Sequence, residues 1–211
     1  MLLLSHVGIT LAAAVLVKKA FASWAASQNE VEPAEDIAES HDLPPVSSPK
    51  PRPARLIDSI DWRLVIVGSM LPDIIDKPVG TAIFAHTFEN GRIFTHTLLV
   101  SLILLLAGFC LYHWRQKAWL LVIALSSGFH LVLDQMWREP RTFLWPSMGW
   151  AFPRYDVHNW LSRTIEEAQT EPATYVPEII GTIIVGSLVL YLLFKGGVLS
   201  FIKTGRIAPE Q

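Results

Sequence analysis

Histidine and aspartate residues recur beside the apolar stretches of this chain, and two pairs of them have helical spacing. His130 and Asp134 are four residues apart, and Asp73 and Asp76 are three residues apart. Residues with these spacings project from one face of a helix, so each pair is placed to reach a common ion. Imidazole together with carboxylate suits Zn, Mn or Fe better than Ca or Mg. The spacing predicts divalent-metal chemistry.

The elements that must position these residues are membrane helices. The chain has 211 residues, of which 51% are hydrophobic and 17% charged, and its mean hydropathy is +0.37. This composition is too apolar for an ordinary soluble domain. The lone Cys110 excludes a disulfide framework and a thiolate cluster. No block of basic residues with interleaved aromatics is present, so nucleic acid is not expected as a partner.

Five apolar stretches predict an all-α, polytopic membrane helix bundle with about five membrane helices. The third and fourth stretches are joined by a short polar connection and should form an antiparallel hairpin. The second is short for a membrane span. The first has a competing interpretation as a signal peptide, although its lysines follow the apolar run rather than precede it. The stretches are residues 2–17, 62–75, 93–112, 118–133 and 176–194.

The remaining segments are polar or aromatic. Residues 27–53 are rich in Pro, Glu and Ser and predict a disordered linker. Residues 134–175 contain several tryptophans, which favour headgroup depth, and predict a long loop lying on the membrane surface. The expected organisation is therefore a first membrane helix in 1–26, the linker in 27–53 and a helix bundle carrying the His/Asp site in 54–211.

The positive charges predict an orientation. With five passes, most lysines and arginines next to the apolar stretches fall on one side, which should be cytoplasmic and includes the C-terminus. The ionisable residues near the helix ends then converge on the opposite, non-cytoplasmic face. Because a buried charge at membrane depth needs a partner or a function, a metal ion is the expected partner. The predicted metal ligands are His6, Asp73, Asp76, His96, His130 and Asp134.

Each member of this set also has a structural interpretation. His6 alone fits an interfacial or hydrogen-bonded helix residue equally well, and His130 with Asp134 fits a hydrogen-bonded pair. Asp73 and Asp76 each also fit a residue that caps or terminates the helix, with Asp76 paired to Lys77. His96 stands between two threonines, whose hydroxyls could cap a helix start. Three arginines on the outer side are either solvated loop charges or a clamp for phosphate or another anion. These are Arg92, Arg138 and Arg141.

Three sequence blocks resemble a known family. The strings GSMLPDIID, GRIFTHTLLV and GFHLVLDQMW, in this order and preceded by SHVGIT, resemble the YdjM-like family of membrane-bound proteins regarded as metal-dependent hydrolases. The resemblance implies the same six ligands, with Arg92 and Thr95 beside them. It also implies a distant relation to zinc-dependent phospholipase C, and hence phosphoester hydrolysis by metal-activated water.

The chain departs from the family pattern at two places. Gly91 stands where family members often have His, and the two aspartates of the Pro-Asp block are more widely spaced. One ligand is then absent or replaced by His86. The long linker after the first helix also leaves open whether His6 returns to the site.

The expected function is an integral-membrane metal-dependent hydrolase. Zinc is the favoured metal and manganese the alternative, and the catalytic residues are predicted to be Asp76, as proton acceptor, with Arg92 and Thr95. The substrate would be a phosphoester or lipid-linked molecule reached among the membrane lipids. The alternative is a non-enzymatic membrane protein, either a metal-binding or transport component or a scaffold whose linker recruits a partner.

Overall fold

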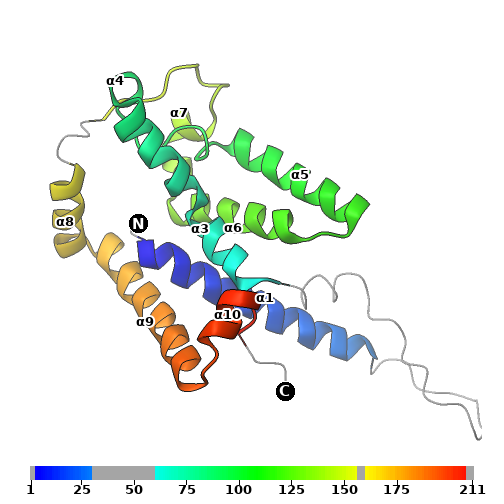
Figure 1. Ribbon diagram of the computed structural model, residues 1–211. Coiled ribbons are helices and arrows are strands. Elements are labelled where there is room, and N and C mark those ends of the chain that lie inside the picture. Colours follow the sequence, from blue (N-terminus) through cyan, green and yellow to red (C-terminus); the bar gives the residue numbers. More distant parts are fainter. Residues whose placement is uncertain (1–2, 30–59, 156–159, 208–211) are drawn as a thin grey trace, which may run out of the picture.

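The computed structural model describes residues 3–29, 60–155 and 160–207, and all the regular elements in these ranges are helices. This confirms the predicted all-α class. The helices pack as crossing pairs rather than as a parallel bundle (Figure 1). They are α1 (Leu3–Asn29), α3 (Trp62–Pro78), η1 (Val79–Ile83), α4 (Ala85–Phe88), α5 (Leu98–Arg115), α6 (Trp119–Leu133), η2 (Met136–Arg138), α7 (Pro140–Phe143), α8 (Trp160–Thr170), α9 (Pro172–Phe194) and α10 (Val198–Thr204).

Three of the described helices are long and apolar enough to cross a membrane: α1, α5 and α9. The other two predicted spans are shorter, with 17 residues in α3 and 15 in α6. At 1.5 Å per residue, α6 is about 22 Å long, less than the roughly 30 Å of a bilayer's hydrocarbon core. The helix lengths therefore support three of the five predicted membrane spans.

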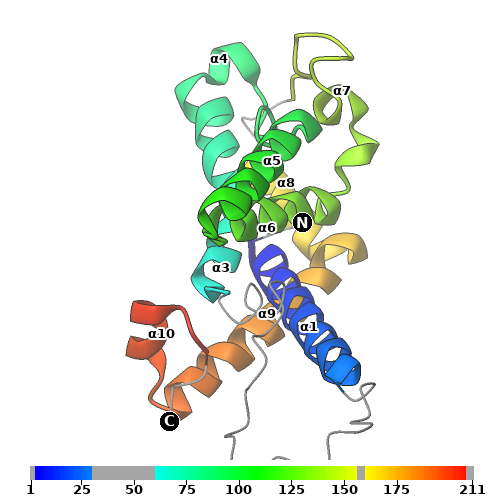
Figure 2. The same ribbon diagram turned by 90° about the vertical axis from the view of Figure 1, so that its right-hand side faces the viewer.

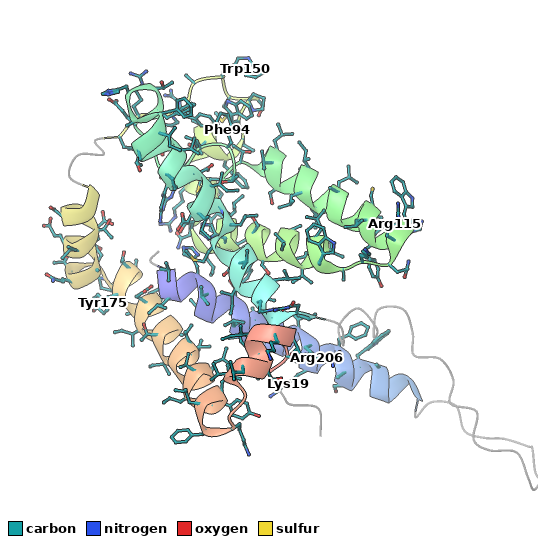
Figure 3. The ribbon with its side chains drawn as sticks, in the orientation of Figure 1. Lys19, Phe94, Arg115, Trp150, Tyr175 and Arg206 are labelled. Atoms are coloured by element: carbon teal, nitrogen blue, oxygen red, sulfur yellow. The ribbon has the colours of Figure 1, made fainter. Side chains whose placement is uncertain are left out.

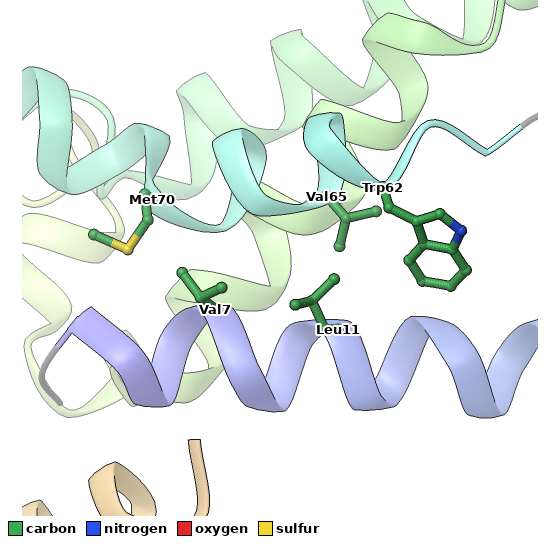
Figure 4. Packing of buried hydrophobic residues seen from close by; sticks show 5 residues of the cluster. All are labelled: Val7, Leu11, Trp62, Val65 and Met70. Carbon is green, nitrogen blue, oxygen red and sulfur yellow. The ribbon is translucent and has the colours of Figure 1, made fainter. Parts of the chain in front are cut away.

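An apolar core joins α1 to α3. Val7 and Leu11 of α1 face Val65 and Met70 of α3, and Trp62 closes one end of the cluster (Figure 4). The start of α3 is capped by Asp61, whose carboxylate accepts the Arg63 amide at 3.0 Å. The same end of α3 contacts α10, because the Trp62 amide donates to the Gly205 carbonyl at 3.0 Å.

The predicted hairpin is present. Helix α5 ends where Gln116 adopts a left-handed conformation with φ of 54°, and α6 returns alongside it (Figure 1). A Cβ on Gly108 would lie 2.8 Å from the Leu121 Cα, so the hairpin packs with little space between the backbones. Arg115 lies at the far end of the hairpin, away from Phe94 and Trp150 (Figure 3).

The structure differs from the predicted elements in three places. Helix α1 continues past Lys18 and Lys19 to Asn29, so the first residues of the predicted linker are helical, and the rest of it, 30–53, lies outside the described residues. The predicted long loop contains η2, α7 and α8, and α10 follows α9. Short amphipathic helices such as α8 were missed because their few apolar residues form no long apolar run.

Candidate metal centre

The crossing of α3 and α6 brings the first two candidate ligands together. Small residues line this crossing: a Cβ on Gly68 would lie 2.8 Å from the Ser126 Cβ. Close backbone approach is typical where Gly and Ser meet at a helix crossing. Asp73 stands on α3 and His130 near the end of α6, and His130 Nε2 lies 3.8 Å from Asp73 Oδ1.

The third candidate ligand, His96, lies in the loop just before α5. Thr97 caps this helix by accepting the Val100 amide at 3.2 Å, as one structural interpretation of the sequence foresaw. The loop is tied to α3 by the Asp76 carboxylate, which accepts the amides of Ile93 at 2.8 Å and Thr95 at 3.0 Å. A buried carboxylate therefore sets the position of His96.

The Nδ1 nitrogens of His96 and His130 both have hydrogen-bond partners. Nδ1 of His96 lies 2.8 Å from an Asp76 oxygen, and Nδ1 of His130 lies 2.7 Å from the Ser69 carbonyl oxygen. A carbonyl oxygen only accepts, so Nδ1 of His130 carries the hydrogen, and a carboxylate favours the same tautomer in His96. Hydrogen bonds of this kind orient metal-binding histidines in known sites.

The Nε2 nitrogens of the same two rings face each other. His96 Nε2 and His130 Nε2 are 3.4 Å apart, and both side chains are fully buried. In the tautomer described above, each presents a lone pair and neither can donate to the other. A cation between them, either a metal ion or an added proton, resolves this clash of acceptors.

Carboxylates complete the cluster on two sides. Asp73 Oδ1 lies 3.5 Å from His96 Nε2, and this buried oxygen accepts no hydrogen bond from the described residues. Its other oxygen binds Lys77 Nζ at 2.7 Å. Asp134 Oδ2 lies 4.0 Å from His130 Nε2, as expected for residues four apart on a helix.

His6 reaches this cluster from α1. Its ring stacks on His130 with 4.0 Å between the centroids, and its Nε2 lies 3.1 Å from Asp134 Oδ1. The linker between α1 and α3 therefore does not keep His6 from the cluster. Unlike the other two rings, His6 has no hydrogen-bond partner for Nδ1 within the described residues.

The donor set fits a divalent ion. Two groups of side chains place their ligand atoms within 4.8 Å of one another: His6, Asp73 and His130, and His96, His130 and Asp134. Zinc ligands at about 2.0–2.1 Å from the ion lie about 3.4 Å apart at tetrahedral angles. The separations of 3.4 and 3.5 Å at His96 match this value. His130 belongs to both groups with one available nitrogen, so the geometry favours one ion.

An ionic network borders the cluster. Arg92 binds Asp134 Oδ2 at 3.0 Å and Glu139 Oε1 at 3.2 Å, while Tyr155 donates its hydroxyl to Glu139 at 3.1 Å. Burial alone would lower the pKa of Arg92, but Asp134 and Glu139 outweigh it and raise the pKa above its ordinary value. Burial, followed by the Glu139 carboxylate, raises the pKa of Tyr155. Arg92 therefore stays charged.

Comparison with protein families gives a match over residues 1–199, to the family described as YdjM inner membrane protein. The chain belongs to this family. The match covers α1 to α9 and confirms the resemblance carried by the Pro-Asp, Thr-His and His-x-x-x-Asp blocks. Membership and the apolar helices together identify an integral membrane protein. No curated protein matches this YdjM-family chain, and no solved structure does.

The predicted site residues of this YdjM-family protein fall into two sets. Five donors converge, whereas Asp76 turns both oxygens toward the backbone amides of the loop and toward His96. Thr95 donates its hydroxyl to the Pro72 carbonyl at 3.0 Å, a structural role. The convergent donors are His6, Asp73, His96, His130 and Asp134.

The other predicted residues lie elsewhere. His86 is exposed on α4 and belongs to neither donor group, so it does not supply the extra ligand that the sequence comparison at Gly91 suggested. Arg138 and Arg141 are exposed, and of the three predicted clamp residues only Arg92 binds a donor carboxylate.

Two charged residues border the cluster through contacts that the sequence did not predict. Lys77 pairs with Asp73, four residues earlier on α3, rather than with the adjacent Asp76 that the sequence suggested as its partner. Glu139 gave no signal in the sequence, because it is brought to Arg92 across 47 residues of sequence.

Proposed function

We propose that this protein is a metal-dependent hydrolase of the membrane, acting on a phosphoester or lipid-linked substrate. One observation carries the proposal: the buried Nε2 atoms of His96 and His130 are 3.4 Å apart. The Nδ1 atoms of the same rings already have partners, the Asp76 carboxylate and the Ser69 carbonyl. When bound, a divalent ion at these donors supplies Lewis acidity and a water of lowered pKa. Zinc is our first choice and manganese the second, because the donors are imidazole and carboxylate.

The cations beside the cluster suit an anionic substrate. Lys77 and Arg92 each bind one donor carboxylate, and 54% and 34% of their side chains are exposed. They can therefore contact a substrate phosphate while remaining anchored. Arg92 has the planar guanidinium that pairs with phosphate oxygens. Exposed aromatic residues near the same loop, including Phe94 and Trp150, support a substrate taken from the membrane interface (Figure 3).

Glu139 replaces Asp76 as proton acceptor in this proposal. The Asp76 oxygens already accept hydrogen bonds in a fully buried position. Glu139 is 30% exposed, belongs to neither donor group and is held beside the cluster by Arg92. A carboxylate in this position can take a proton from a water while Arg92 keeps it oriented.

The test is metal content and activity of the purified protein in detergent. We expect one equivalent of zinc or manganese per chain, lost in Asp73→Asn and His130→Ala and retained in His113→Ala, which changes an exposed histidine on α5. Metal-free wild-type protein with an intact helical fold would overturn the proposal. Bound metal without hydrolysis of any soluble or lipid phosphoester would instead support the non-enzymatic metal-binding function.

The proton acceptor has its own test. Glu139→Gln should lower kcat by about 10²–10⁴-fold while the bound metal is retained. Glu166→Gln, which changes an exposed carboxylate on α8, should leave kcat unchanged. Equal rates for Glu139→Gln and wild type would remove Glu139 from the mechanism.

A further inference from the structure

Glu178 is a carboxylate within the apolar helix α9, and its partners are the first turn of α1. Its Oε1 accepts the Leu4 amide at 3.0 Å and its Oε2 accepts the Ser5 amide at 2.9 Å. Amides at a helix N-terminus have no partners within their helix and carry partial positive charge. An ionised carboxylate satisfies both requirements, and an ionisable residue at membrane depth usually marks a function.

A second contact holds the same helices together. A Cβ on Gly8 would lie 2.5 Å from the Gly181 carbonyl oxygen, and a Cβ on Gly181 would lie 2.5 Å from the Ser5 Cα. The two backbones are therefore in direct contact, and any side chain at either position separates the helices. Both views of the protein show the start of α1 beside the first half of α9 (Figures 1 and 2).

The residue after Ser5 is the candidate ligand His6. Two other histidines of the cluster are oriented through Nδ1, His96 by a carboxylate and His130 by a carbonyl. His6 has no such partner for Nδ1 among the described residues, although its ring is fully buried. Apart from the contact of its Nε2 with Asp134, its position is set by packing and by the backbone that carries it. Glu178 binds that backbone directly.

We infer that Glu178 is a positioning residue for the metal site: by capping α1 across the α1–α9 crossing, it holds His6 against His130 and Asp134. None of the candidate metal ligands lies on α9, so the contribution of this helix to the site is to hold His6 in position. This inference rests on the proposed metal-binding function. It assigns a role in that function to a residue 172 positions away from His6 in the sequence.

The experiment is a double-mutant cycle on metal affinity in the full-length protein, with Zn²⁺ titrated against a competing chelator. Glu178→Ala should weaken Zn²⁺ binding about 10–100-fold, the usual effect of losing an orienting partner. Glu178→Gln should weaken it less, because one amide oxygen still accepts a hydrogen bond. In a His6→Ala background, Glu178→Ala should cause no further loss. Glu167→Gln, an exposed carboxylate on α8, is the matched control and should bind as wild type does.

A backbone variant tests the same contact without removing the carboxylate. Gly181→Ala should weaken Zn²⁺ binding in the same way, whereas Gly186→Ala, whose Cβ would meet nothing within 4 Å, should not. The Co²⁺-loaded protein gives a spectroscopic readout, because loss of His6 as a ligand changes the visible absorption. The Glu178→Ala spectrum should resemble that of His6→Ala.

The outcomes separate this inference from the proposed function. Wild-type protein that binds no metal overturns the proposed function and, with it, the role of Glu178. Wild-type protein that binds metal while Glu178→Ala binds it equally well overturns the inference alone. An equal loss in the presence and absence of His6 also overturns it, because Glu178 would then act on the whole fold rather than through His6.

Discussion

Asp73 and Asp76 lie one helical turn apart on α3 and have different environments. Asp73 directs one oxygen to the histidine nitrogens and the other to Lys77. Asp76 lies within hydrogen-bond distance of Nδ1 of His96, and its oxygens accept loop amides. The first therefore acts as a candidate ligand and the second as the group that orients one. Two aspartates one helical turn apart therefore have different roles.

The first prediction tests this division. Asp76→Asn should weaken zinc binding about 10–100-fold without abolishing it, because the five donors remain and only the orientation of His96 is lost. Asp73→Asn should abolish binding. The measurement is Zn²⁺ affinity by chelator competition. Wild-type affinity in Asp76→Asn would contradict the orienting role.

The matched control is Ser69→Ala. His130 contacts the Ser69 carbonyl rather than its hydroxyl, which donates to the Ile66 carbonyl at 2.8 Å. Alanine keeps the carbonyl in place, so zinc affinity should remain that of wild type even though a buried side chain has changed.

At the scale of helices, the site depends on two close crossings. Helix α3 meets α6 at Gly68, which brings Asp73 to His130, and α1 meets α9 at Gly8 and Gly181, which brings His6 to the same point. In each case a glycine removes the side chain that would separate the backbones. The pairing of helices, rather than any single helix, forms the donor set.

The second prediction concerns the α3–α6 crossing. Gly68→Ala places a Cβ 2.8 Å from the Ser126 Cβ and 2.9 Å from the Ile123 carbonyl oxygen, neither of which can swing away. Overpacking of this kind should lower the free energy of unfolding by about 1–3 kcal/mol. Denaturant unfolding of the detergent-solubilised protein measures it.

Gly186→Ala is the control for this prediction. A Cβ there meets nothing within 4 Å, and alanine favours helix over glycine by about 1 kcal/mol in a helix interior. The free energy of unfolding should therefore stay the same or rise. A loss equal to that of Gly68→Ala would mean that the crossing is not tightly packed.

At the scale of the whole molecule, the candidate ligands come from α1, α3, the last turn of α6 with the residue that caps it, and the loop before α5. A bound ion would connect segments that are far apart in the sequence. Because an ion binds the folded state and not the separated segments, its binding energy adds to the stability of the fold.

The third prediction follows from this linkage. Chelation of the metal should lower Tm by about 5–10 °C relative to protein with metal at 100 times Kd, equivalent to about 2.7 kcal/mol. The Asp73→Asn variant should show no difference between chelator and zinc. Scanning fluorimetry on both proteins measures the effect, and an unchanged wild-type Tm would contradict it.

The fourth prediction concerns orientation in the membrane. We propose, from the distribution of positive charges, that the site faces the non-cytoplasmic side and the C-terminus the cytoplasm. In a Cys110→Ser background, Trp150→Cys should react with an impermeant maleimide on spheroplasts, and Lys203→Cys only after lysis. Both positions are exposed. The opposite labelling pattern would reverse the orientation.

The sequence alone determined the apolar helices, the hairpin and five donors that converge in the structure. Helical periodicity and long apolar runs are local properties, so residues four apart, such as His130 and Asp134, can be assigned to one face without knowing the fold. The shorter helices within 134–175 were missed because they lack such runs.

The tertiary structure decided which side chains act together. Whether a carboxylate meets a metal ion or a backbone amide depends on the segment packed against it, and for Asp76 that segment is the loop carrying His96. Glu139 meets Arg92 between two loops, and Glu178 meets α1 across a helix crossing at Gly8 and Gly181. No local pattern records these contacts, because each joins residues that are far apart in the sequence and that only the packing of the helices brings together.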